Sequence, residues 1–337
     1  MSRVRIADVA KAAHVSNATV SFAFNKPEEI SERTRNRVMA VARRVGYTPH
    51  PTARSLSTKR SGSIGFLIPQ SVDVVFANPF VSYLIRGIGE VCEQHDLTML
   101  LVPPLNGSLE SAIGRAAVDG FISLGLNKGD RSLDTLRRLG LPCILVDADP
   151  QVGVAAVNID DRGGAAAAAA HLLELGHRRI VIAGLGAPRD HGESGIGADR
   201  LAGYRQTIRN AGGGTARVIP AGVTFASGQA AFRHLLRWRN RPTAVLAMSD
   251  MAAIGLMAAA REHGMRLPEE LSVVGYDDIP MASWVTPALT TVRQPIAEKG
   301  RQAAQLLIAQ LAGKRVKSPQ PLATELVVRQ STAAPRP

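Results

Sequence analysis

The sequence has little that would suit an exported, membrane-bound or metal-binding protein. Its 337 residues include only two cysteines, Cys92 and Cys143, which are far apart and lack the spacing of a disulfide framework or a zinc site. The most apolar stretch is interrupted by His171 and Glu174 before it reaches the roughly 18 residues of a membrane span, and the first residues contain no apolar signal-peptide core. We therefore expect a cytoplasmic protein with no membrane partner, no metal site and no cofactor.

The sequence also lacks the short motifs of common enzymes. The stretch "GLGAPRDHG" is close to a dinucleotide-binding loop, but Arg189 occupies the third glycine position of G-x-G-x-x-G. The chain contains no phosphate-binding G-x-x-x-x-G-K, no G-x-S-x-G and no H-E-x-x-H. We therefore expect no catalytic residues. A sugar-binding transport component is another alternative, but it would need export and would not need the N-terminal unit described below.

The composition fits a folded protein of more than one domain. Hydrophobic residues make up 45% and charged residues 20%, which is ordinary for a globular chain, and the length favours two or three domains. The formal net charge is +12, and twelve Lys or Arg against four acidic residues up to Arg60 supply two thirds of it. This basic segment suits a polyanion-binding unit, although a solubilising surface would have the same composition.

Three short helical patterns open the chain. The apolar residues of "IADVAKAA" repeat at helical spacing, and Ser16 is a good N-cap for a second helix from Asn17 to about Phe24. Ser31 caps a third helix, "ERTRNRVMAVARRV", which Gly46 ends. The following segment "YTPHPTARSLSTKRSG" marks a boundary, either as a plain linker or as a short helix that is ordered only on a partner.

From Ser63 onward, short apolar runs alternate with helical patterns, which predicts parallel strands in βαβ units. The runs are "SIGFLIP", "TMLLVPP", "GFISLGL", "PCILVD", "RIVIAGLG", "ARVIPAG", "TAVLAMS" and "LSVVGYDDI". They fall into two successive groups. The sequence therefore predicts two doubly wound lobes.

Seven further motifs follow one another along the chain: "IADVAKAAHVSNATVSFAFN", "ARSL", "NPF", "LGHRRI", "VVGYDD", "PALTTVRQP" and "TELVVRQST". In this order they make the chain resemble the lactose-repressor (LacI) family of bacterial transcription regulators. The resemblance implies a small all-α helix-turn-helix head and an α/β periplasmic-binding-protein-like core of two doubly wound parallel-sheet lobes. We expect the head at 1–48, a hinge helix and linker at 49–61 and the effector-binding and dimerisation core at 62–337. Lobe one would take about 62–160 and 293–323, and lobe two about 161–292 and 324–337.

The resemblance also implies a function. The chain would be an effector-responsive, sequence-specific DNA-binding regulator, and by family frequency a repressor of a carbohydrate uptake or catabolism operon. A homodimer would bind a pseudo-palindromic double-stranded operator, and a small sugar-like ligand between the lobes would change operator affinity. A nucleoside- or purine-responsive regulator, and an activator of the same architecture, stay open.

The predicted second helix is small enough to enter the major groove of DNA, where amides and hydroxyls can contact bases or phosphates. The candidate DNA-binding residues of the head are Ser16, Asn17, Ala18, Thr19, Ser21, Phe22, Asn25, Ser31, Thr34 and Tyr47. In the hinge, the resemblance adds Ala53 and Leu56, with Leu56 as an apolar wedge in the minor groove.

Two residues depart from the usual family pattern. His14 stands where the turn commonly has glycine, and histidine tolerates positive φ better than most residues. Phe22 stands where arginine is frequent, so a bidentate guanine contact would be replaced by apolar surface. The alternative for Phe22 is a place in the core.

Candidate effector-binding residues follow the ends of predicted strands, where parallel sheets bind ligands. They are Phe80, Asp147, Arg200, Phe225, Asp250, Asp277 and Trp284. Arg200 and Asp277 match family positions that bind effector, whereas Asp250 and Phe225 could equally serve as caps or surface residues, and Trp284 could lie at a subunit contact. Carboxylates, a guanidinium and aromatic walls suit hydroxyl-rich rings such as sugars or nucleosides.

Overall fold

The structure is a computed structural model that describes residues 4–48, 60–126, 129–149, 151–185, 195–212 and 216–336. The chain divides into two compact units. The first, here called the head, comprises Met1–Ser63 with Ala117–Asp119, and the second, the core, comprises Ile64–Ala116 with Gly120–Pro337. The predicted hinge residues Ala53 and Leu56 lie outside the described residues.

The three predicted helices of the head are confirmed. They are α1 (Ile6–Ala13), α2 (Asn17–Asn25) and α3 (Glu32–Val45), with a short 3-10 turn η1 (Pro27–Glu29) before α3. The Ser16 hydroxyl accepts a hydrogen bond from the Thr19 amide, and Ser31 caps α3 in the same way. His14 ends α1 at φ 51°, as expected from its tolerance of the left-handed region. Buried valines and alanines from all three helices form a small separate core around Val20.

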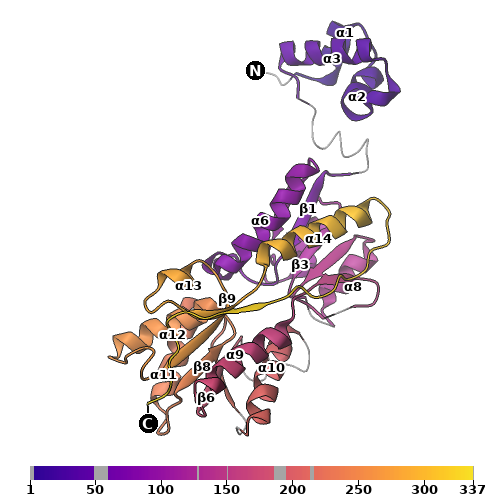
Figure 1. Ribbon diagram of the computed structural model, residues 1–337. Helices are drawn as coiled ribbons and strands as arrows, with labels where there is room; N and C mark the ends of the chain where they lie inside the picture. The colour runs from indigo at the N-terminus through magenta and orange to yellow at the C-terminus, as the bar shows by residue number, and fades with distance from the viewer. Residues whose placement is uncertain are drawn as a thin grey trace. The chain divides into compact units, whose positions relative to one another are not determined.

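The first sheet of the core forms lobe one. Its strands lie in the order β2-β1-β3-β4-β5. They are β1 (Ser63–Leu67), β2 (Thr98–Val102), β3 (Phe121–Leu124), β4 (Cys143–Val146) and β5 (Ala155–Val157). The associated helices are α5 (Val72–Ala77), α6 (Pro79–Gln94), α7 (Leu109–Arg115), α8 (Arg131–Arg138) and, from much later in the chain, α14 (Ile296–Leu311). Helices α6 and α14 lie side by side over this sheet (Figure 1).

The second sheet forms lobe two, in the order β11-β10-β9-β8-β6-β7. The strands are β6 (Ile180–Gly184), β7 (Arg217–Pro220), β8 (Ala244–Ala247), β9 (Ser272–Asp277), β10 (Thr290–Arg293) and β11 (Glu325–Val327). The helices are α9 (Asp161–Glu174), α10 (Ile196–Asn210), α11 (Phe225–Leu236), α12 (Asp250–Glu262) and the short α13 (Met281–Trp284). Helices α9 and α10 cover one face of the sheet, and α11 and α12 the other (Figure 1).

The doubly wound α/β fold class is confirmed, with one difference in detail. Strand β11 pairs antiparallel with β10, whereas the pairs β1–β3, β3–β4, β4–β5, β6–β7, β6–β8, β8–β9 and β9–β10 are parallel. Strands β5, β10 and β11 were not predicted, because they are short and none is a long apolar run. An antiparallel edge strand on an otherwise parallel sheet is common in such folds.

The chain passes between the two lobes three times, after β5, after β10 and before β11. The first and third passages pair with each other, because Asp160 N donates to Leu322 O and Leu322 N donates to Asn158 O, both at 2.9 Å. The second passage contains Gln294. Among the described residues, no helix combines the length and apolar character that crossing a membrane requires.

Two of the helix pairs meet at glycine. A Cβ atom at Gly87 of α6 would overlap the carbonyl oxygen of Ala297 in α14, and one at Gly228 of α11 would overlap the carbonyl oxygen of Ala252 in α12. Glycine is therefore what allows these helix backbones to touch.

Candidate functional site

Helix α2 presents two different faces. Val20 and Ala23 are buried against the rest of the head, whereas Ser16, Asn17 and Ala18 are exposed. Thr19 and Ser21 are half-buried beside them. The mixed composition of this stretch therefore reflects one face for packing and one polar face that is free to contact a partner.

The two phenylalanines of α2 have different environments. The Phe22 side chain is 37% exposed, while the Phe24 ring packs edge-on against Tyr47 with centroids 5.8 Å apart. Phe24 thus takes the core position, and the exposed interpretation of Phe22 is favoured. At the end of the helix, Asn25 donates to the Ser21 hydroxyl at 3.3 Å, which fixes both polar side chains on the same side.

The core contains a cleft of about 320 Å³ between the two lobes, at the carboxyl ends of their strands. Four predicted effector-binding residues line it: Phe80 from α6, Asp147 after β4, Arg200 from α10 and Asp277 at the end of β9. Its other lining residues are Pro69, Gln70, Asn78, Val81, Leu124, Gly125, Leu185, Gly195, Ile196, Gly197, Ala198, Val223, Met248 and Ser249. Both lobes thus contribute predicted residues to the cleft lining.

Three other predictions for the cleft need correction. Phe225 and Trp284 do not line it, and their side chains are 38% and 73% exposed. Thr224 is the N-cap of α11 and Phe225 is its first residue; Val223, just before the cap, lines the cleft instead. Asp250 is completely buried behind the cleft, where it accepts hydrogen bonds from the Ile279 amide and the Thr291 hydroxyl.

Lys299 of α14 is the most unusual residue near the cleft, and sequence reasoning missed it. Its side chain is 0% exposed. The ammonium donates to both carboxylate oxygens of Asp147 at 2.7 Å and to Gln294 Oε1 at 2.6 Å, and it lies 4.7 Å from the centroid of the Phe80 ring. Lys299 therefore holds Asp147 and Phe80, which line the cleft, although Lys299 does not line the cleft itself. A buried lysine has no simple sequence signal, because lysine is normally exposed.

Gln294 extends this network to lobe two. Its Nε2 donates to Asp277 Oδ1 at 2.6 Å, so hydrogen bonds run from Asp147 through Lys299 and Gln294 to Asp277. Burial raises the pKa of Asp277 to about 6, although Arg200 and Lys299 oppose the shift. One continuous polar chain thus joins the carboxylates of the two lobes at the floor of the cleft.

Arg200 is held on three sides. Its Nε donates to Asp161 Oδ1 and its Nη1 to the Met248 carbonyl, both at 2.7 Å, and the guanidinium lies 3.7 Å from the centroid of the Tyr276 ring. Both members of the ion pair are buried. Burial raises the pKa of Asp161 above its ordinary value, and the opposing effect of the Arg200 charge is smaller. The guanidinium is therefore rigid and has its charge balanced before any ligand binds.

Ser249 offers an unused hydrogen-bonding group. It lines the cleft, its side chain is buried, and its Oγ has no hydrogen-bond partner among the described residues. A buried hydroxyl without a partner is costly unless something else supplies the bond. The hydroxyl is thus available to a polar group of a ligand.

The buried carboxyl of Asp250 predicts a pH dependence of stability. Burial and the nearby Asp277 raise the pKa of Asp250 from 3.8 to about 8. The folded core therefore binds more protons than the unfolded chain between these values, and the stability that Asp250 contributes is lost as the pH rises through this window. We expect the melting temperature to fall between about pH 5 and about pH 8, and less steeply in Asp250→Asn. Asp134→Asn, at an exposed site, is the control, and its melting temperature should fall with pH as steeply as that of the wild type. The same fall in all three proteins would contradict the raised pKa of Asp250.

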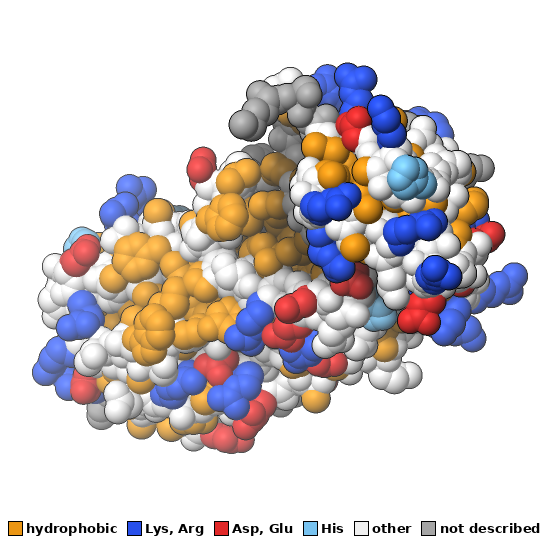
Figure 2. All heavy atoms as spheres, turned by 90° about the horizontal axis from the view of Figure 1, so that it is seen from above, with side chains coloured by type: hydrophobic (Ala, Val, Ile, Leu, Met, Phe, Trp, Pro, Cys, Tyr) orange, Lys and Arg blue, Asp and Glu red, His pale blue; other side chains and the backbone are white. Residues whose placement is uncertain are grey.

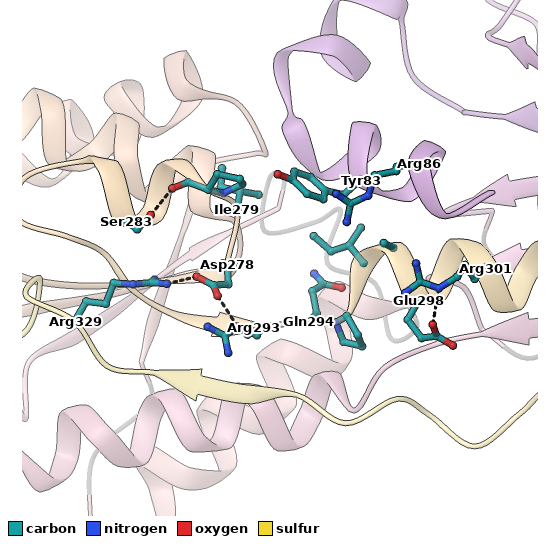
Figure 3. Close-up of a pocket in the computed structure, with 14 residues that line it drawn as sticks. Tyr83, Arg86, Asp278, Ile279, Ser283, Arg293, Gln294, Glu298, Arg301 and Arg329 are labelled. Carbon is teal, nitrogen blue, oxygen red and sulfur yellow. Dashed lines mark hydrogen bonds and ion pairs between the residues drawn. The ribbon is translucent and has the colours of Figure 1, made fainter. Parts of the chain in front are cut away.

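A second hollow of about 400 Å³ lies beside the cleft (Figure 3). Tyr83 and Arg86 reach it from α6, and Arg293 and Arg329 both hold the Asp278 carboxylate, at 2.7 and 2.6 Å. Gln294 lines this hollow and is hydrogen-bonded to Asp277, which lines the cleft. The consecutive residues Asp277 and Asp278 thus face different spaces, and both have positive φ, 132° and 57°.

Known proteins resemble the chain over both of its units. The family model described as "Bacterial regulatory proteins, lacI family" matches residues 5–50, and that described as "Periplasmic binding protein-like domain" matches residues 169–332. The chain is 35% identical to the HTH-type transcriptional repressor CytR of Escherichia coli, over 97% of this chain and 96% of that one. It is 32% identical to the HTH-type transcriptional regulator CelR of Thermobifida fusca, over 96% of each.

Two solved structures are similar along almost the whole chain. The lac repressor dimer bound to operator and the anti-inducer ONPF has a TM-score of 0.84 and 26% identity, covering 99% of this chain and all of that one. A complex of the transcriptional regulator CelR with cellobiose has a TM-score of 0.73 and 30% identity, covering 98% of this chain and 100% of that one. These relatives are transcriptional regulators rather than enzymes. Because the sequence relatives exceed 30% identity over nearly the full length and the head matches the family model, the chain belongs to the lacI family of bacterial regulatory proteins.

Proposed function

We propose that the chain is a repressor that binds a pseudo-palindromic operator as a homodimer, and that an uncharged, hydroxyl-rich small molecule in the cleft changes its operator affinity. The observation that carries the ligand class is the pairing of charges in the cleft: Asp147 is neutralised by Lys299, and Arg200 by Asp161. An anionic ligand would have to draw Arg200 out of its buried pair at high cost, whereas a hydroxyl can add a hydrogen bond to a carboxylate that keeps its partner.

Three further features support this ligand class. Ser249 provides an unpartnered hydroxyl, Phe80 provides an aromatic wall, and the cleft volume lies in the usual range for small-molecule sites. A sugar fits all of these features. A nucleoside is the second candidate, because Phe80 could also stack on a base.

Thermal-shift and calorimetric screening of neutral sugars and nucleosides tests the proposed ligand class. A binder should raise the melting temperature of the wild type, and Asp277→Asn should weaken its binding while operator binding remains. Ser249→Ala should weaken ligand binding by about 1 kcal/mol if the hydroxyl contacts the ligand. Selective binding of anionic sugars or nucleotides, with no neutral binder, would exclude the proposed class.

The head supports operator binding. The exposed Asn17 and the half-buried Thr19 and Ser21 are hydrogen-bonding side chains on a helix that contains no acidic residue. One head covers a single half-site, so two heads and an inverted repeat are expected. Binding selection from randomised DNA, followed by footprinting, tests this directly. A protected site without inverted symmetry would contradict the homodimer on a pseudo-palindrome.

Exposed apolar side chains support self-association. Large apolar residues are exposed on α5, α11 and α13, including Phe76, Phe225 and Trp284. Apolar side chains also gather into a broad patch in the view of Figure 2. Patches of this kind usually mark contacts with another chain. A second copy is the expected partner, because the relative with the TM-score of 0.84 is a dimer.

Phe22→Arg should change base preference in the operator. An exposed phenylalanine favours the methyl group of thymine, whereas arginine can donate two hydrogen bonds to guanine. We expect the preference at one base pair per half-site to shift toward G·C by about 1 to 3 kcal/mol. Parallel selections from randomised operators with both proteins measure the shift. Identical preferences from two folded proteins would show that this side chain does not read DNA.

A further inference from the structure

A cluster of exposed arginines on lobe two takes no part in the function proposed above. It lies at the amino-terminal ends of the neighbouring strands β7, β6 and β8, which is the end of the sheet away from the cleft. We call it the arginine surface; it consists of Arg178, Arg179, Arg217, Arg237, Arg239 and Arg241. Arg217 begins β7, Arg179 directly precedes β6, and the other members lie beside them or in the loop before β8.

No carboxylate pairs with any of these six arginines among the residues that the structure describes. Elsewhere in the core, arginines such as Arg266 and Arg293 do have acidic partners. The arginine surface is therefore a local positive excess rather than a lattice of ion pairs. An anionic partner would not need to displace an internal carboxylate there.

Three of the guanidinium groups are nevertheless held in place. Arg217 lies over the Trp238 ring at 3.9 Å from its centroid, and Arg179 Nε donates to the Arg241 carbonyl at 3.2 Å. Arg178 Nη1 donates to two carbonyl oxygens, those of Leu173 and His177. Stacking and carbonyl contacts fix a planar guanidinium and leave most of its N–H donors free, which is the arrangement that suits bidentate binding of phosphate.

The surroundings favour nucleic acid over an acidic protein as the partner. None of the large apolar residues exposed in the described part of the chain falls in the segments that carry these arginines, 177–180, 216–218 and 236–242, and protein interfaces normally have an apolar centre. Neighbouring strands lie about 4.8 Å apart, so the ends of β7, β6 and β8 span about 10 Å. This span is close to the roughly 12 Å width of the DNA major groove, so the surface can meet both phosphate backbones.

We propose that the arginine surface binds the phosphate backbone of double-stranded DNA without sequence preference, and so gives the core a DNA contact separate from that of α2. This second DNA contact goes beyond the proposed function, because a regulator that binds its operator through the head does not need the core to touch DNA.

The test removes the contribution of the head first. In the full chain, Asn17→Glu with Ser21→Glu introduces repulsion from phosphates on α2, and fluorescence anisotropy then measures binding of a labelled duplex of unrelated sequence at several salt concentrations. We expect weak, salt-sensitive binding to remain. Adding Arg237→Gln, Arg239→Gln and Arg241→Gln should reduce the affinity about tenfold or more, and should lower the slope of log K against log salt by about two to three.

The matched control removes the same charge from lobe one, through Arg115→Gln, Arg131→Gln and Arg138→Gln in the same background. These residues are exposed, and the control should bind within about twofold of its parent. An equal loss in both triple variants, or no loss in either, would overturn the proposal. Competition by polyglutamate as effective as that by unlabelled duplex, at equal charge concentration, would also overturn the assignment to DNA. Failure of the α2 substitutions to weaken selected operator binding would instead count against the proposed function.

Discussion

Replacing Lys299 with methionine is expected to lower the free energy of unfolding by about 3 to 5 kcal/mol. Methionine is similar in length but leaves the buried Asp147 carboxylate without its ammonium partner, and it also removes the hydrogen bond to Gln294. An uncompensated buried charge costs far more than the net contribution of the intact pair. Chemical denaturation monitored by circular dichroism at neutral pH measures the change.

The double variant Lys299→Met with Asp147→Asn separates charge from shape. Because it removes both charges together, it should recover much of the lost stability, but it should not recover ligand binding, since Asp147 lines the cleft. Lys314→Met, at an exposed position after α14, is the control and should change stability little. If the double variant were no more stable than Lys299→Met alone, the loss would come from packing rather than from the unpaired carboxylate.

The second large effect is expected at Gly87. An alanine there would place its methyl group against the Ala297 carbonyl and push α6 away from α14. We expect Gly87→Ala to lower the free energy of unfolding by about 1 to 3 kcal/mol, because the new methyl group would meet the backbone carbonyl of Ala297, which cannot rotate aside as a side chain could. The same denaturation experiment measures it.

Gly89 provides a matched control in the same helix. A Cβ atom at Gly89 would have nothing within 4 Å, and its φ is not in the left-handed region. Gly89→Ala should therefore be neutral or stabilise the protein by about 0.5 to 1 kcal/mol through helix propensity. Similar destabilisation by both substitutions would show that close helix contact is not the reason for glycine at position 87.

The head could be predicted from the sequence almost residue by residue. Its helix boundaries depend on local chemistry: Ser16 and Ser31 accept hydrogen bonds from the first turns, and His14 and Gly46 end helices in the left-handed region. These signals act within three or four residues of one another. A pattern search along the chain therefore contains most of the information needed.

Parts of the core could not be predicted because they depend on contacts distant in sequence. Strand β5 has only three residues, and β11 becomes a strand only by pairing with β10 through Thr291 and Val327 and their neighbours. Helix α14 follows β10 of lobe two in the chain yet packs on the sheet of lobe one, a placement that only the family resemblance, and no local pattern, led us to expect. Such placements come from tertiary packing rather than from local preference.

The candidate cleft shows the same division. Asp147, Arg200 and Asp277 could be predicted, because each follows or faces the end of an apolar strand or matches a family position. Val223, just before the N-cap of α11, lines the cleft and Phe225, just after it, does not; a difference of two residues at a helix start is beyond what a sequence pattern resolves. Lys299 could not be recognised, because only the fold brings it to Asp147 across 152 residues of sequence.

The two consecutive residues at the end of β9 give the core a built-in thermodynamic linkage. Positive φ at non-glycine residues costs about 1 to 3 kcal/mol each, and at Asp277 and Asp278 the hydrogen bonds of their carboxylates offset this cost. One carboxylate faces the cleft and the other the neighbouring hollow, so a molecule bound to either carboxylate would compete with the hydrogen bonds that hold the same turn. Any change that occupancy of one space makes to affinity in the other must be matched by an equal factor in the reverse direction.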